Sequence, residues 1–320
     1  MVLVDAAAYA PTQPLDLSSL QADFVDIAFY KMFGYPTGLG ALLVRTEAMP
    51  LMQKVFWGGG SIALATSSDN FHVFKCKPSE KMEDGTVSFL DIISLKHGFA
   101  QMDKLGGITR IQAHVGALTA WLYTALTRLT HSNGQPMVKV FGKHQLPNAG
   151  QVQGGIVNFE VLGPQGDCLS YRRIEREAAA AGFHLRTGAE CNPGACYAYL
   201  GVAEAEVEGL AGIKEGCGDD IEFIRVLRPQ GHQGQVAAPM GQQGEQVQAE
   251  NGWVAPGPPP TPGGGESTWV RVPLGSVRVS LGWMSSFEDV FAFTAWLQRS
   301  YRDAENLVEE DSTVTLLPRE

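Results

Sequence analysis

The sequence predicts an α/β protein in which part of a large α/β domain is followed by a smaller α+β domain. The first hundred residues alternate short apolar runs with turn residues, which is typical of strands in an α/β sheet. From about Phe89 onward, apolar residues recur at three- and four-residue spacing, which indicates helices. With 320 residues, 44% of them hydrophobic, the chain can bury a sizeable core.

The first strand of the large domain is predicted at residues 2–4, and Asp5 follows it directly. The apolar run Val2, Leu3 and Val4 is typical of a buried parallel strand, and open α/β sheets bind ligands at the carboxyl ends of such strands. Further strand-like runs follow in "DFVDIAFYK" and "GLGALLVR". We therefore assign residues 1–107 to a partial large domain.

Two helices follow, separated by a glycine pair. The runs "FLDIISLKHGFAQMDKLGG" and "ITRIQAHVGALTAWLYTALTRLTHS" both have helical periodicity, and Gly106-Gly107 breaks them apart. The second helix is expected to lead into the next domain.

The second domain is predicted to span 108–229 and 269–305, with a tail at 306–320. Its strands are expected in "MVKVFG", "GGIVNFEVLG" and "SVRVSLG", and its helices in "YRRIEREAAAAG", near 195–200 and at about 286–302. Gly182 ends the first of these helices. The intervening segment 230–268 is rich in Gly, Pro and Gln, so it is predicted to be a disordered insertion that cannot bury enough apolar area to fold.

Composition excludes several classes of function. The net charge is −10 and no basic tract occurs, so we expect no nucleic-acid partner. No apolar run reaches the ~18 residues of a membrane span, and no secretory signal precedes the first strand, so we expect a cytoplasmic protein without a membrane partner. The five cysteines are an odd number at irregular spacing, which favours free thiols.

A strand-end carboxylate and a lysine point to one kind of cofactor. Lys31 lies about 25 residues after Asp5, between an apolar run that is expected to desolvate its ammonium partly and a turn rich in glycine and proline (Gly34, Pro36, Thr37, Gly38 and Gly40). Pyridoxal phosphate (PLP) chemistry uses this pair: the lysine holds the cofactor as a Schiff base, and the carboxylate pairs with the pyridinium nitrogen. Taken alone, Lys31 could be a surface lysine and Asp5 a turn residue.

The second half of the chain holds further candidates. Arg278 interrupts a strand rich in β-branched residues and is expected on the face opposite its neighbours. The alternative is an ordinary arginine that faces solvent and has no role in a site. Cys191 and Cys196 could be buried thiols or half of a zinc site, although a single C-x4-C pair makes zinc a poor interpretation.

Four motifs together carry a family resemblance. In order, "DFVDIAFYKMFGYPTGLGALLVR", "EDGTVSFLDIISLKHG", "LRTGAECNPGAC" and "GSVRVSLGWMSSFEDV" closely resemble the N-terminal, NifS-like domain of the molybdenum cofactor sulfurase family. That family belongs to the class V, fold-type I PLP enzymes, related to cysteine desulfurases. The resemblance covers nearly the whole chain except 230–268.

The resemblance implies roles for five residues. Lys31 would be the PLP lysine, Asp5 the pyridinium partner and Cys191 the thiol that receives sulfur from L-cysteine, releasing alanine. Arg278 and Arg186 would hold the substrate carboxylate, for which a guanidinium is well suited. The sulfur would finally reach the molybdenum cofactor of xanthine dehydrogenase or aldehyde oxidase-type enzymes, and a homodimer is implied. A mobile loop at Pro193-Gly194 is expected to carry the persulfide.

The chain also departs from the family pattern. Tyr30 stands where many cysteine desulfurases have histidine, which favours the narrower family, and Ala189 replaces a cysteine found in some members. The upstream part of the large domain and a C-terminal MOSC domain are not in the sequence, so a fragment is expected. A non-catalytic remnant or partner subunit is the rival interpretation; Cys191 argues against an aminotransferase or lyase of the same fold.

Overall fold

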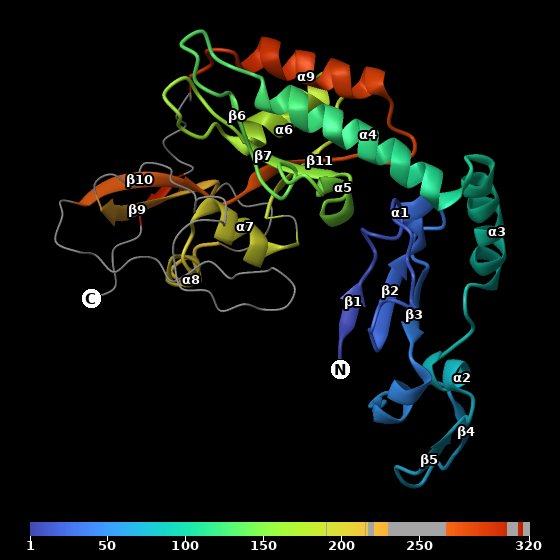
Figure 1. The fold of residues 1–320 in the computed structure, drawn as a ribbon. Coiled ribbons are helices and arrows are strands. Elements are labelled where there is room, and N and C mark those ends of the chain that lie inside the picture. Colours follow the sequence, from blue (N-terminus) through green and yellow to red (C-terminus); the bar gives the residue numbers. More distant parts are fainter. Residues whose placement is uncertain (190, 215, 217–220, 230–266, 306–312, 316–320) are drawn as a thin grey trace. The chain divides into compact units, whose positions relative to one another are not determined.

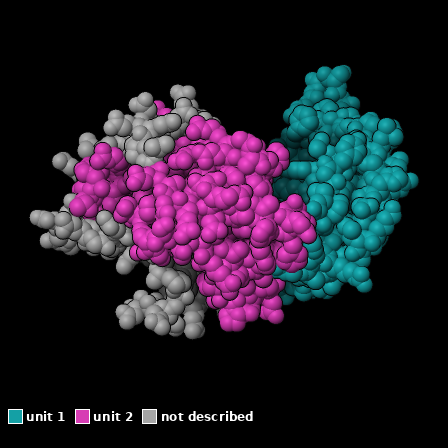
Figure 2. All heavy atoms as spheres, turned by 90° about the horizontal axis from the view of Figure 1, so that it is seen from above, with its two compact units in different colours: residues 1–117, 282–284 teal, residues 118–281, 285–320 magenta. Residues whose placement is uncertain are grey.

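The chain divides into two compact units. The computed structural model describes residues 1–189, 191–214, 216, 221–229, 267–305 and 313–315. Unit 1 contains residues 1–117 and 282–284, and unit 2 contains residues 118–281 and 285–320 (Figure 2). The division falls inside helix α4 (Gly107–Thr127), so the first predicted domain, 1–107, lies within unit 1.

Unit 1 is organised around a three-stranded sheet in the order β1-β2-β3 (Figure 1). Strand β1 (Leu3–Asp5) runs parallel to β2 (Phe24–Ala28), and β3 (Gly40–Val44) runs antiparallel to β2. The parallel β1 strand is confirmed, but its predicted burial is wrong because Leu3 is 62% exposed. The reason is position: β1 is the edge of this sheet, and among the described residues no strand pairs with its other side.

The remainder of unit 1 consists of short elements and the predicted long helix. These are α1 (Phe29–Phe33), a 3-10 helix (Thr46–Leu51), β4 (Ile62–Ala65), β5 (His72–Phe74), α2 (Pro78–Met82) and α3 (Phe89–Lys104). The predicted break between α3 and α4 is confirmed. Gly106 and Gly107 have φ angles of 91° and 78°, which side chains rarely adopt.

Unit 2 contains a four-stranded antiparallel sheet in the order β6-β7-β11-β8. The strands are β6 (Val138–Val140), β7 (Ile156–Val161), β11 (Ser276–Ser280) and β8 (Arg186–Gly188). Helices α6 (Tyr171–Ala180) and α9 (Phe287–Tyr301) are where the sequence predicts them, and α5 (Ala149–Val152) is added. Phe159 of β7 meets Phe293 of α9 with ring centroids 6.3 Å apart, so the core lies between sheet and helices.

A second sheet in unit 2 was not predicted. Strands β9 (Phe223–Pro229) and β10 (Ser267–Pro273) pair antiparallel, and β12 (Thr313–Thr315) pairs with β9. Helices α7 (Pro193–Leu200) and α8 (Glu204–Glu208) precede it. The predicted insertion, 230–268, lies outside the described residues except for 267 and 268, which begin β10. The predicted tail, 306–320, lies outside them except for 313–315, which form β12.

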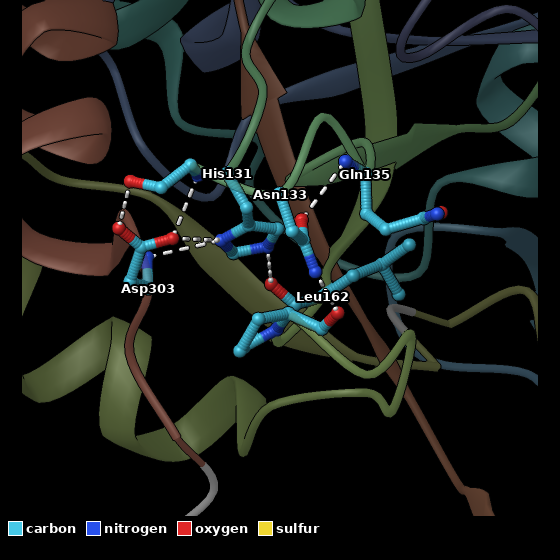
Figure 3. Close-up of polar contacts among 7 residues, drawn as sticks. His131, Asn133, Gln135, Leu162 and Asp303 are labelled. Carbon is cyan, nitrogen blue, oxygen red and sulfur yellow. Dashed lines mark hydrogen bonds and ion pairs between the residues drawn. The ribbon is translucent and has the colours of Figure 1, made fainter.

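A histidine ties the end of α9 to the loop after α4 (Figure 3). The buried ring of His131 accepts a hydrogen bond at Nδ1 from the Asp303 amide (3.0 Å), while its Nε2 lies 3.0 Å from the carbonyl oxygen of Leu162. The Asp303 carboxylate accepts from the amide and the hydroxyl of Ser132, at 2.8 and 2.5 Å. These contacts connect the loop after α4, the loop after β7 and the residues after α9.

Candidate active site

Lys31 lies in helix α1, immediately after strand β2. The structure places this lysine on the surface of unit 1, so the expected partial desolvation of its ammonium is wrong. The apolar neighbours that motivated the expectation turn away from it: Phe29 and Phe33 instead pack against Phe99 of α3. Among the described residues, the Lys31 amine makes no hydrogen bond or ion pair, which leaves it available to a ligand.

Helix α1 is fixed by two contacts that the sequence did not reveal. The Phe33 ring lies so close to Gly98 that a Cβ at this glycine would stand 2.4 Å from a ring carbon. The indole Nε1 of Trp283 donates a 2.8 Å hydrogen bond to the carbonyl oxygen of Met32. That carbonyl is one of the terminal groups that a short helix leaves unpaired, so Trp283 holds the turn next to Lys31.

Asp5 ends strand β1 at the same edge of the sheet. Its Oδ1 accepts a 2.9 Å hydrogen bond from the Ala7 amide, which orients the carboxylate. Because β1 and β2 are parallel with Asp5 opposite Asp26, the carboxyl ends of both strands meet at one edge, and Lys31 follows β2 there. A backbone-oriented carboxylate, together with an amine that has no partner among the residues the structure describes, is the donor set that fits PLP.

The predicted arginines are neighbours in the sheet of unit 2. Arg278 of β11 lies directly opposite Arg186 of β8. Thr187, next to Arg186, turns the other way, and its hydroxyl donates to Glu175 of α6 at 2.8 Å. The two arginines therefore share the face of the sheet opposite α6, as the alternation around Arg278 predicts.

The two candidate cysteines differ in exposure. Cys191 is exposed and has a φ of 63°, whereas Cys196 is buried within α7 at 8% exposure. The expected mobile loop at Pro193-Gly194 is wrong: Asn192 caps α7, and these two residues form its first turn. Proline suits that position because its nitrogen would have no helical partner there. The described residues contain no group of three or more His, Cys, Asp or Glu that could hold a metal.

The candidate residues thus form two groups. Asp5 and Lys31 belong to unit 1, and Arg186, Arg278 and Cys191 belong to unit 2. Each group combines chemically matched side chains: a carboxylate with an amine in unit 1, and two guanidinium groups with an exposed thiol in unit 2. These are the residue types of an enzyme that handles an amino acid on PLP.

The comparisons with known proteins define the class. The aminotransferase class-V family model matches residues 1–204, so the chain belongs to this family. A molybdenum cofactor sulfurase of Homo sapiens is 37% identical over 297 residues, which are 92% of this chain and 28% of the relative. The chain thus spans less than a third of that relative's length.

Solved structures share the fold. A cysteine desulfurase from Thermococcus onnurineus NA1 in the apo form superposes with a TM-score of 0.58 at 20% identity, covering 94% of this chain and 52% of that chain. A mutant of C-DES with glycine covalently linked to its PLP cofactor superposes with a TM-score of 0.53 at 14% identity, covering 91% and 49%. The predicted fold class is confirmed, because the chain belongs to the aminotransferase class-V family and shares the fold of these two structures. Among the described residues, no helix has both the length and the apolar character that a membrane crossing requires.

Proposed function

We propose that this chain is the desulfurase part of a molybdenum cofactor sulfurase, which takes sulfur from L-cysteine as a persulfide on Cys191. The carrying observation is the pair Arg186 and Arg278, which stand opposite each other on adjacent strands, with the exposed Cys191 following Arg186 after a short loop. The 37% identical relative is itself a molybdenum cofactor sulfurase, which supports this choice within the family.

The residues of unit 1 would hold the cofactor and move one proton. The amine of Lys31 would hold PLP, and the carboxylate of Asp5 would pair with its pyridinium nitrogen. When bound, PLP supplies an electron sink for the electron pair left at the substrate Cα. The Lys31 amine would also be the base that takes the Cα proton of L-cysteine.

The residues of unit 2 would bind the substrate and accept its sulfur. The guanidinium groups of Arg186 and Arg278 bind the carboxylate of L-cysteine. The thiolate of Cys191 attacks the substrate sulfur, so a sulfur-sulfur bond forms as the bond from sulfur to Cβ breaks. The carbon takes up a proton and leaves as L-alanine. The step balances without an external oxidant, because the electron pair of the broken carbon–sulfur bond stays on the carbon, which is reduced while the two sulfur atoms are oxidised to the persulfide.

The final acceptor would be the molybdenum cofactor of xanthine dehydrogenase or aldehyde oxidase-type enzymes, and the protein would act as a homodimer in the cytoplasm. The exposed apolar side chains of α3 support association: Phe89, Leu90 and Ile93 are 56%, 70% and 56% exposed. Sedimentation of the complete protein should give twice the mass of one chain, and a single-chain mass would contradict the homodimer.

The proposed desulfurase activity is tested by comparing two cysteine variants. In the complete protein loaded with PLP, Cys191→Ala should lose alanine release from L-cysteine by orders of magnitude, because the attacking thiolate is gone. Peptide mass analysis of the wild type after incubation with L-cysteine should find a persulfide on Cys191.

Cys196→Ala is the matched control, since this buried thiol lies only five positions along the same segment. It should keep turnover close to that of the wild type. Loss of turnover in Cys196→Ala with retention in Cys191→Ala would assign the acceptor to the other thiol. A protein that binds no PLP would instead support the non-catalytic alternative.

A further inference from the structure

Two glycines of unit 2 meet backbone to backbone at the start of the segment that carries Cys191. Gly275 lies directly before strand β11, and Gly188 is the last residue of β8. A Cβ at Gly275 would stand 2.4 Å from the Cα of Gly188 and 2.8 Å from its carbonyl carbon. Two carbon atoms pack best at about 3.5–4.0 Å, so position 275 has no room for a side chain.

Gly275 belongs to the fixed side of this contact. Its neighbours Leu274 and Ser276 are both 3% exposed, and the Leu274 amide donates a 2.8 Å hydrogen bond to the carbonyl oxygen of Glu222. Backbone that is buried and hydrogen-bonded resists displacement, because a shift would open the packing or leave polar groups unpaired. A side chain at position 275 would therefore displace Gly188 rather than Gly275.

Gly188 belongs to the side that leads to the thiol. It ends β8 with a φ of 92°, and Cys191 follows three residues later. The Asn192 amide donates a 3.0 Å hydrogen bond to the carbonyl oxygen of Ala189, and Cys191 lies between these two residues in the sequence. Only two residues separate Gly188 from Cys191, so a displacement of this glycine moves the base of the segment that presents the thiol.

We propose that Gly275 is a positioning residue, whose close contact with Gly188 sets where the thiol of Cys191 lies relative to strand β11. This proposal rests on the proposed function, in which Arg278 of β11 binds the carboxylate of L-cysteine and Cys191 attacks its sulfur. The two ends of one small substrate must be met at the same time. A shift of the thiol therefore spoils the geometry of attack, although the arginine still binds the carboxylate.

The first test separates substrate binding from sulfur transfer. In the complete protein loaded with PLP, Gly275→Ala should lower the kcat for alanine release from L-cysteine about a hundredfold, the effect of a misplacement on the order of 1 Å. Calculating kcat per bound PLP removes the contribution of unfolded protein. The KM should change less than about threefold, because Arg278 lies on the strand that stays in place.

Gly194→Ala is the matched control for this test, because Gly194 lies three residues after Cys191. A Cβ there would meet no atom within 4 Å in the described part of the chain, so kcat should not change. An unchanged kcat in Gly275→Ala, or equal losses of kcat in both variants, would overturn the proposal.

If Gly275→Ala does not fold, Ala189→Gly tests the same placement from the other side. Ala189 links Gly188 to the segment of Cys191, and it packs partly buried against the apolar cluster around Leu200. Glycine removes this contact and adds backbone freedom without introducing a clash. The kcat per bound PLP should then fall several-fold at an unchanged KM, and full activity would overturn the proposal.

Hydrogen exchange measured by mass spectrometry needs no turnover. Peptides that cover 186–195 should exchange several-fold faster in Gly275→Ala than in the wild type, while peptides of β7 should exchange at the same rate in both. Equal exchange of 186–195 would overturn the positioning role. If the wild type formed no persulfide on Cys191, the proposed function would fail, yet this measurement would still decide whether Gly275 holds the Cys191 segment.

Discussion

The indole of Trp283 donates a hydrogen bond to the carbonyl of Met32, the residue directly after the predicted cofactor lysine. Trp283 follows strand β11, which carries Arg278, by only a few residues. The residues that follow β11 therefore supply a hydrogen bond that holds α1 in place. This contact gives the chain a direct means of holding α1 in one orientation.

Replacing this indole should weaken α1. Trp283→Phe removes the donor and leaves the carbonyl of Met32 without its partner, which costs about 1 kcal/mol in the free energy of unfolding. Urea unfolding of the complete protein measures the change. Trp269→Phe is the matched control, because Trp269 is 40% exposed on β10 and its replacement should cost less. Equal losses in both variants would contradict a specific role of the Trp283 hydrogen bond.

The covalent attachment site of PLP is expected at Lys31. Borohydride reduction of the loaded protein, followed by digestion and peptide mass analysis, should find the pyridoxyl group on this residue, because its amine has no partner in the described chain. Lys54 is the informative comparison: its amine already forms an ion pair with Asp84 and should remain unlabelled. Finding the label on Lys54 or on Lys96 would overturn the assignment of Lys31.

Local features of the fold could be predicted from the sequence. Two helix ends are examples: α3 ends at Gly106-Gly107, and α6 ends before Gly182. In each case a glycine with positive φ ends the helix, and a few neighbouring residues are enough to predict it. The strand around Arg278 and the closing helix α9 follow from periodicities of two and 3.6 residues. Such signals are local, so no knowledge of the tertiary structure is required.

Features that depend on distant partners could not be predicted. The pairing of β9 with β10 joins segments on either side of residues 230–266, and no local pattern specifies that register. The exposure of Lys31 also depends on tertiary packing. Phe29 and Phe33 of α1 pack against Phe99 of α3, so they do not cover the lysine. For the same reason, the position of Arg278 opposite Arg186 becomes visible only once the strand order is known.

The hydroxyl of Tyr301 should contribute measurably to the stability of unit 2. This side chain is fully buried at the end of α9 and donates a 2.5 Å hydrogen bond to Glu177 of α6, which also accepts from Arg173. Tyr301→Phe should lower the free energy of unfolding by about 1.5–3 kcal/mol, the range for a hydrogen bond to a charged group. Tyr199→Phe, on an exposed side chain, should change it by less than about 0.5 kcal/mol, and a similar loss in both variants would contradict this role.

His144 should make the stability of unit 2 depend on pH. Burial lowers the pKa of this imidazole, which stacks on Tyr123 at 5.5 Å, and a hydrogen bond with the backbone of Ile156 opposes the shift only in part. Because the folded state then binds fewer protons than the unfolded state, the contribution is complete above the unfolded pKa of about 6.5 and is lost as the pH falls below it. His144→Phe keeps an aromatic ring beside Tyr123 but cannot be protonated. The loss of unfolding free energy between pH 7.5 and 5.5, measured with urea, should therefore be smaller in His144→Phe than in the wild type. His97→Gln, on an exposed histidine of α3, should retain the wild-type loss. An equal pH dependence in His144→Phe and the wild type would show that protonation of His144 does not drive it.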